Sequence, residues 1–199
     1  MKNDSLRFVQ LSDAEEILGI YAPFVEKTYI SFETKTPSLE EFQKRIAGFL
    51  TFYPYLVCTI DGRIAGYSYA HRFRERAAYD WSAETTIYTA PDSRRRGVGG
   101  RLYGALTEIL RLQNIKNLYA IVTAPNAASE GFHEACGFSV SGVQHNCGWK
   151  FGQWYNSKLY EKIIGTYEKE PAPIRPVRDL PPEAVQDILA RFGVGEGKM

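Results

Sequence analysis

A strand, a glycine-rich turn and a helix follow one another between residues 81 and 110, and this order restricts the possible folds more than any other feature. Residues 85–89 (TTIYT) are β-branched or aromatic, which suits a half-buried strand. Pro91 ends that strand. Glycines then lead into a helix whose apolar face is Val98, Leu102, Ala105, Leu106, Ile109 and Leu110. Main-chain N–H groups at such a helix start can approach an anion closely, so the segment predicts a backbone anion site.

The kind of anion depends on the residues of the turn. The turn lacks the Gly-Lys-Ser/Thr ending of a P-loop and the Gly-x-Gly-x-x-Gly order of a dinucleotide-binding fold. It reads Arg94-x-x-Gly97-x-Gly99, and this order resembles the pyrophosphate-binding turn of the GNAT acetyltransferase superfamily. The alternative is a solvated arginine run in front of an ordinary helix.

Composition narrows the class of protein. The 199 residues are enough for one domain with a substantial core. Lysine and arginine number 24 and aspartate and glutamate 23, which argues against a general nucleic-acid or membrane-surface binder. The three cysteines lack metal-ligand spacing, and no apolar run has the length of a signal or a membrane span. We therefore expect a cytoplasmic protein that does not use a metal.

The remaining patterns predict a mixed α/β fold, with a mostly antiparallel sheet flanked by helices, in the order β-α-α-β-β-β-α-β-α-β-β. Capping-box patterns at Ser12 and Ser38 open the first two helices, and Asp61-Gly62 predicts a hairpin turn. A glycine-containing loop is expected between the last two strands. The other elements are strands at 7–11, 56–60, 64–71, 118–124, 138–144 and 154–163, and a helix at 125–135. This order is also the GNAT order.

The composition changes after residue 164. Residues 165–182 carry many prolines and charges and predict an extended linker. Residues 183–192 predict a short amphipathic helix with Val185, Ile188, Leu189 and Phe192 on one face. We therefore divide the chain into a GNAT domain (1–164) and a proline-rich linker with a C-terminal helix (165–199). The helix is too short to be stable alone and should dock on its own domain or on a second subunit; the alternative is a frayed tail.

Several segments together resemble one branch of GNAT, the phosphinothricin N-acetyltransferases and their amino-acid acetyltransferase relatives. The resemblance covers roughly residues 6 to 162 and excludes the tail. The segments that carry it are 28–32 (TYISF), 61–70 (DGRIAGYSYA), 74–85 (RERAAYDWSAET), 94–103 (RRRGVGGRLY), 125–138 (PNAASEGFHEACGF) and 148–154 (GWKFGQW). Tyr155-Asn156 depart from the His-Asp of that branch, in a region that contributes to its dimer, so the pocket and interface are less firmly predicted.

The resemblance implies acetyl-CoA as cosubstrate and a homodimer as the assembly. The pyrophosphate is expected at Arg94, Arg95, Arg96, Gly97, Val98, Gly99 and Gly100. The pantetheine arm is expected along Ile87, Tyr88 and Thr89, pairing like an added strand. Asn126 and Ser129 are expected to contact the same cosubstrate, although Asn126 is also a natural helix N-cap.

Acetyl transfer to an amine requires a base, because an amine with a pKa near ~10 is almost entirely ammonium at neutral pH. Glu84 matches the catalytic glutamate of the family, and we predict that it is the base; a surface glutamate is the alternative. A backbone N–H near Ile87 is the expected oxyanion donor. His133 stands where many GNAT enzymes carry a tyrosine acid. It is either that acid or a residue that only hydrogen-bonds or packs.

Arg74, Arg76 and Tyr79 occupy the positions at which the branch binds an acidic amino acid, and Phe32 that of an aromatic wall. Arginine binds carboxylates in bidentate fashion, so we expect a small anionic amino-acid-like acceptor. A solvated loop is the alternative reading of the arginines. Two other functions stay open: a GNAT enzyme for another amine, such as a polyamine or peptide N-terminus, and a non-catalytic CoA-binding module.

Overall fold

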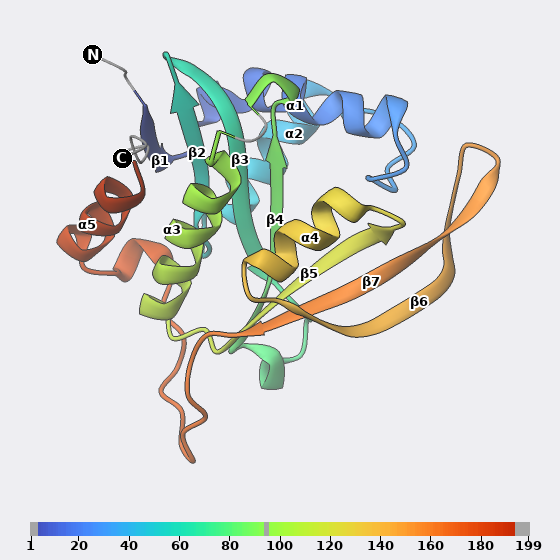
Figure 1. The fold of residues 1–199 in the computed structure, drawn as a ribbon. Helices are drawn as coiled ribbons and strands as arrows, with labels where there is room; N and C mark the ends of the chain where they lie inside the picture. The colour runs from blue at the N-terminus through green and yellow to red at the C-terminus, as the bar shows by residue number, and fades with distance from the viewer. Residues whose placement is uncertain (1–3, 94–95, 194–199) are drawn as a thin grey trace.

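The computed structural model describes residues 4–93 and 96–193. Seven strands form one sheet in the order β1-β2-β3-β4-β5-β7-β6. They are β1 (Ser5–Phe8), β2 (Tyr55–Ile60), β3 (Arg63–Arg72), β4 (Ser82–Thr89), β5 (Asn117–Ala124), β6 (Ser139–Lys150) and β7 (Gln153–Ile163). Neighbouring strands are antiparallel except β4 and β5, which run parallel. The predicted fold class and element order are confirmed (Figure 1).

Helices cover both faces of the sheet. They are α1 (Ala14–Lys27), α2 (Leu39–Phe49), α3 (Val98–Leu112), α4 (Ala127–Ala135) and α5 (Pro182–Gly193). Figure 1 shows α3 and α4 in front of the sheet and α1 and α2 behind it. One hydrophobic cluster joins α1 and α2 to β2 and β3, and the other joins α3 and α5 to the opposite face. In the part of the chain that the structure describes, no helix has the length and apolarity needed to cross a membrane.

Two of the predicted local signals are confirmed. The Ser38 hydroxyl accepts a hydrogen bond from Glu41 N at 3.2 Å, and the Glu41 carboxylate accepts one from Ser38 N at 2.9 Å, so this capping box opens α2. Asp61 and Gly62 have φ angles of 52° and 80°, which is the left-handed geometry of a two-residue hairpin turn.

The predicted capping box of the first helix is wrong. A 3-10 turn, Leu11–Asp13 (η1), precedes α1, and the capping box joins Gln10 to Asp13 instead of starting at Ser12. Asp13 Oδ2 accepts a hydrogen bond from Gln10 N at 2.7 Å, and it also pairs with Arg7 at 2.6 Å. The turn begins at Leu11, and β1 ends at Phe8 instead of residue 11.

The glycine-containing connection predicted between the last two strands is present, but it is much shorter than the predicted strand ends imply. β6 and β7 continue into the predicted loop and meet at a turn in which Phe151 and Gly152 have φ angles of 49° and 79°. Register shifts between Val140 and Gly142 and between Gln144 and Gly148 absorb the extra residues of β6. The result is a long hairpin that projects from the sheet (Figure 1).

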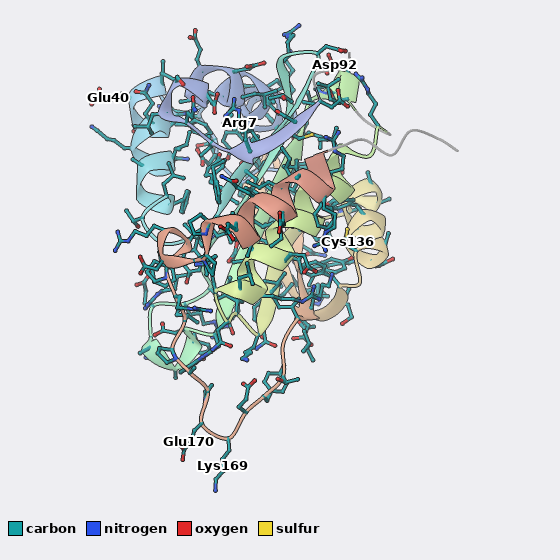
Figure 2. The ribbon with its side chains drawn as sticks, turned by 90° about the vertical axis from the view of Figure 1, so that its left-hand side faces the viewer. Arg7, Glu40, Asp92, Cys136, Lys169 and Glu170 are labelled. Atoms are coloured by element: carbon teal, nitrogen blue, oxygen red, sulfur yellow. The ribbon has the colours of Figure 1, made fainter. Side chains whose placement is uncertain are left out.

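The C-terminal segment docks on its own chain. Figure 2 shows α5 lying across α3, and Val185 and Ile188 belong to the same hydrophobic cluster as α3. Arg101 Nε donates to Phe192 O at 2.8 Å. The connection before α5 is held where Trp81 Nε1 donates to Ala172 O, also at 2.8 Å. Its turn, which bears Lys169 and Glu170, projects from the body (Figure 2).

Candidate active site

The parallel pair β4 and β5 separates soon after it begins. Its register contains three pairs, and the last joins Glu84 to Tyr119. Beyond this point β4 continues to Thr89 and β5 to Ala124, and Figure 1 shows them running in different directions. β4 stays paired with β3 on its other side. The β5-facing backbone edge of β4 beyond Glu84 is therefore available to an extended ligand, as the sequence prediction for residues 87–89 requires.

Side chains of β4 alternate between two environments. Thr85 and Ile87 face the α3 layer, where Thr85 Oγ1 lies 3.1 Å from the Tyr103 hydroxyl and Ile87 packs on the core. Glu84, Thr86 and Tyr88 face the α1 and α2 layer. This alternation follows from the pleat of the strand and places the predicted base on the tyrosine-rich side.

Glu84 is the carboxylate at the point where the strands separate. Its side chain is 20% exposed, and Oε1 lies 3.7 Å from His71 Nε2 on the neighbouring strand. Burial raises the pKa of Glu84 above its ordinary value, and a charged His71 offsets part of that shift. A half-buried carboxyl with a raised pKa is suited to taking up a proton near neutral pH.

A cavity of about 300 Å³ lies on the same side of the sheet as Glu84. Its lining includes five tyrosines, with Glu33 and Arg45, which form an ion pair of 2.5 Å. The tyrosines are Tyr21, Tyr55, Tyr67, Tyr69 and Tyr88. Apart from Tyr88, which was expected beside the pantetheine arm, these tyrosines have no role in the sequence prediction. The signal that it missed was the period-two spacing of Tyr67 and Tyr69 opposite Thr86 and Tyr88, which places all four side chains on one face.

The turn before α3 has the form of an anion site. Gly97 is the N-cap residue with a φ of 75°, so its backbone conformation favours glycine. The N–H groups at the start of α3 therefore point away from the helix without a side-chain cap. A Cβ added at Gly99 would lie 2.8 Å from the Phe132 ring, so this glycine also permits the close approach of α4. Arg96 is exposed, whereas Arg94 and Arg95 lie outside the described residues.

Asn126 and Ser129, which were predicted to contact the cosubstrate, make hydrogen bonds within α4 itself. Asn126 is the N-cap, and its side-chain oxygen accepts a hydrogen bond from Ser129 N at 3.3 Å. Ser129 Oγ lies 3.3 Å from His133 Nδ1. The capping alternative for Asn126 is thereby observed, and among the described residues no hydrogen bond engages its side-chain nitrogen.

His133 lies on the opposite side of β4 from Glu84. It is buried, and its Nδ1 lies 2.8 Å from Ser129 O, which can only accept a hydrogen bond. Nδ1 therefore carries the proton, and Nε2 accepts a hydrogen bond from the Tyr103 hydroxyl at 3.0 Å. Burial lowers the pKa of His133, which keeps the ring neutral. The structure thus does not bring the two predicted catalytic residues together. Tyr103, which had no role in the sequence prediction, connects His133 to Thr85.

The predicted acceptor-binding residues form two groups. Arg74 lies in the segment between β3 and β4, with its guanidinium carbon 5.0 Å and 5.2 Å from the ring centres of Phe73 and Tyr79. Arg76 precedes the 3-10 turn η2 (Ala77–Tyr79) and is exposed. Phe32, which is 37% exposed, packs instead against Gly148 of β6, where a side chain would collide with its ring.

No metal site accompanies these groups in the described part of the chain, since no three His, Cys, Asp or Glu side chains are arranged to hold an ion there.

Residues 6–159 match the family model described as an acetyltransferase (GNAT) domain. The chain is 30% identical to the phosphinothricin N-acetyltransferase of Streptomyces viridochromogenes, over 88% of this chain and 93% of that one. It is 39% identical to the enzyme of the same name from Alcaligenes faecalis, over 80% and 82%. It is 33% identical to the L-methionine sulfoximine/L-methionine sulfone acetyltransferase of Pseudomonas aeruginosa, over 75% and 88%.

A solved structure has the same fold. It is a phosphinothricin acetyltransferase from Sinorhizobium meliloti in complex with acetyl-CoA, with a TM-score of 0.78, 27% identity, and coverage of 91% of this chain and 97% of that one. The match to the Streptomyces viridochromogenes relative covers 88% of this chain, so it must continue past residue 165. The expectation that the resemblance ends before the tail is therefore wrong.

Proposed function

The chain belongs to the GNAT acetyltransferase family and is an acetyl-CoA-dependent N-acetyltransferase, and we propose that its acceptor is the amine of a small amino acid with an anionic group. Phosphinothricin, methionine sulfone and methionine sulfoximine are the model acceptors. The names of the relatives support this class, because they combine phosphinothricin with methionine sulfoximine and sulfone. The proposed reaction is direct attack of the amine on the thioester carbon.

The observation that carries the proposal is the position of Glu84 where β4 and β5 separate. Acetyl-CoA would lie along the unpaired edge of β4, with its pantetheine arm beside residues 87–89 and its pyrophosphate at the N–H groups that start α3. The arginines at 94–96 would add positive charge near the phosphates. Asn126 and Ser129 would contribute from the start of α4, which packs on α3 through Phe132.

Glu84 would take the proton of the attacking ammonium, directly or through a water. Its raised pKa makes it a stronger base than an exposed glutamate, and its position on β4 places it beside the thioester end of the proposed pantetheine path. A backbone N–H of β4 near Ile87 would stabilise the oxyanion. The thiolate of CoA then leaves, which needs no metal because a thiol pKa is about 8.5.

The contacts of His133 support a residue that only hydrogen-bonds and packs, rather than an acid for the leaving thiolate. A histidine whose Nδ1 donates to Ser129 O and whose Nε2 is bonded to Tyr103 has no free ring nitrogen for the leaving thiolate. We propose that His133 is a positioning residue that fixes Tyr103, and through it the Thr85 side of β4.

Arg74 and Arg76 would bind the carboxylate of the acceptor. Both are exposed and lie in the segment that leads into β4, and the planar faces of Phe73 and Tyr79 orient the Arg74 guanidinium. Phe32 would form an aromatic wall on the side of β6.

We also propose a cytoplasmic homodimer. Support for the dimer comes from the projecting β6–β7 hairpin, on which Trp149, Phe151 and Trp154 are 56%, 58% and 59% exposed. Exposed aromatic clusters of this kind favour association. The three free cysteines agree with a reducing compartment.

A thiol-release assay with acetyl-CoA tests the acceptor class. The panel contains phosphinothricin, methionine sulfone, methionine sulfoximine, common amino acids, spermidine and a short peptide. We expect turnover with the first three and little with spermidine, whose charges Arg74 and Arg76 would repel. Turnover confined to spermidine or the peptide would leave the fold and cosubstrate unchanged and would refute the acceptor.

A further inference from the structure

The tyrosine-lined cavity holds no uncompensated charge among the described residues that line it. Its charged residues are Glu33 and Arg45, and these pair with each other at 2.5 Å. The rest of the lining is aromatic or aliphatic, apart from the hydroxyls of the tyrosines and Thr86. Among its described lining residues, a ligand group that enters this cavity therefore meets neutral polar groups and a cation that is already paired; the ammonium of Lys150 lies behind the lining, where it donates to Val25 O and Ser31 O.

Two tyrosine hydroxyls of the cavity make no hydrogen bond within the described ranges. Tyr55 and Tyr67 are only 2% and 1% exposed as whole residues, but both line the cavity, and their hydroxyls do not belong to the fully buried polar atoms that lack a partner. Burial and the neighbouring tyrosines raise the pKa of both well above 10.0, so both remain neutral and can donate. A ligand oxygen inside the cavity would give these hydroxyls an acceptor away from bulk water, where a hydrogen bond contributes more than at the surface.

The cavity lies on the same face of β4 as Glu84, two residues further along the strand, at Thr86. On β3 and β4, His71 pairs with Glu84 and Tyr69 with Thr86, and Tyr69 and Thr86 line the cavity. Phe49, another lining residue, stacks on His71 and Tyr69 with ring centres 5.6 Å and 4.8 Å apart. An acceptor that presents its amine to Glu84 can therefore extend its other end past Tyr69 into the cavity.

We infer, on the basis of the proposed function, that this cavity receives the acceptor's side chain and that this side chain ends in an uncharged hydrogen-bond acceptor. A sulfone or sulfoximine has this chemistry, whereas a phosphinate is anionic. Tyr55 and Tyr67 donate to the oxygens of the uncharged group. An anion in the same place would be buried beside Glu33 without a free cation, and burial of an unpaired charge is strongly unfavourable. The carboxylate of the acceptor stays outside, with Arg74 and Arg76.

Steady-state kinetics with three acceptors test the inference. We expect a higher kcat/KM for methionine sulfone than for phosphinothricin. Tyr55→Phe and Tyr67→Phe should each lower kcat/KM for methionine sulfone about five- to tenfold, the effect of one lost buried hydrogen bond. Both should leave norleucine, which lacks a side-chain acceptor, nearly unchanged. Tyr53→Phe is the control, because Tyr53 is a buried tyrosine of the opposite layer.

A charge change provides a second test. Glu33→Gln releases Arg45 from its ion pair and should raise kcat/KM for phosphinothricin relative to methionine sulfone several-fold. Glu40→Gln, at an exposed pair with Lys44, should not alter that ratio. A wild-type preference for phosphinothricin, or equal losses for methionine sulfone and norleucine in the tyrosine variants, would overturn the inference.

Calorimetric titration of methionine sulfone in the presence of CoA separates this inference from the proposed function. Binding that weakens in Tyr67→Phe supports the cavity even if no amino acid is acetylated, and in that case only the proposed reaction fails. Binding that is equal in wild type and Tyr67→Phe refutes the cavity while leaving the reaction intact.

Discussion

Both faces of β4 meet hydroxyl groups and ionisable side chains, but the two faces differ in how fully these polar groups are hydrogen-bonded. On the α3 side, Thr85, Tyr103 and His133 are buried and bonded to one another. On the α1 and α2 side, Glu84 is partly exposed, and the hydroxyls of Tyr55 and Tyr67 lack partners among the described residues. Satisfied polar groups stabilise a fold, whereas unsatisfied ones are available to a ligand. We therefore assign structure to the first face and chemistry to the second.

The largest effect that we expect is a loss of activity on the α1 and α2 side of β4, where Glu84 lies. Glu84→Gln removes the base but keeps the shape, so kcat should fall about 10²- to 10⁴-fold. Acetyl-CoA affinity, measured by calorimetry, should stay within about twofold of wild type, since Glu84 lies at the end of its proposed path. Glu15→Gln, an exposed glutamate of α1, is the control. An unchanged kcat would remove Glu84 from the mechanism. It would also refute the assignment of the chemistry to the α1 and α2 side of β4.

Removal of residues 165–199 tests how much the C-terminal segment stabilises the hydrophobic cluster on the α3 side of the sheet. Leu180, Val185 and Ile188 are buried in the cluster that includes α3, so the free energy of unfolding should fall by a few kcal/mol. If 1–164 is an independent domain, as the sequence predicts, the truncated chain still unfolds cooperatively in denaturant and binds acetyl-CoA. Loss of the cooperative transition would show that the division at residue 164 is wrong.

His133→Gln distinguishes a positioning residue from an acid. The Tyr103 hydroxyl loses its buried acceptor, which should cost about 1–3 kcal/mol of stability. If His133 only positions Tyr103, kcat should fall less than about tenfold, well below the effect expected for a proton donor. A hundredfold loss of kcat with unchanged stability would instead make His133 the acid.

Stability against pH provides a further test of His133. Its folded-state pKa lies below the ordinary 6.5, so below that pH the unfolded chain takes up a proton that the folded chain resists. The wild type should therefore lose stability as pH falls through this range. Denaturant titrations of His133→Gln should show a smaller loss, and an identical loss would contradict the lowered pKa.

The smallest expected effect concerns the pH dependence of the reaction. Glu84 must be ionised to act, and its pKa is raised above the ordinary 4.5. The wild-type kcat/KM should therefore rise with pH, up to about tenfold per unit, and level off once pH passes the raised pKa. The folded state should gain stability as pH falls through the same range, because it binds the Glu84 proton more tightly than the unfolded chain does. The rise of kcat/KM with pH should be absent from Glu84→Gln. If the rise persists in that variant, it reports the titration of another group.

Local patterns were read correctly where neighbours in the chain make the structure. The Ser38 cap, the Asp61-Gly62 turn and the glycine start of α3 each depend on a few consecutive residues. The Ser12 cap was predicted wrongly because Asp13 forms a capping box with Gln10, two residues earlier. The loop between β6 and β7 was predicted too long because register shifts let the two strands continue their pairing.

The sequence alone determined the family, the element order and the position of Glu84 on the central strand, because spacing along the chain carries that information. It could not determine which groups meet across the sheet. Only the tertiary structure buried His133 against Tyr103, and only it gathered tyrosines from β2, β3, β4 and α1 around one cavity. The reason is physical: the pleat divides each strand between two layers, and the packing of distant elements decides which layer encloses its polar groups and which leaves them open.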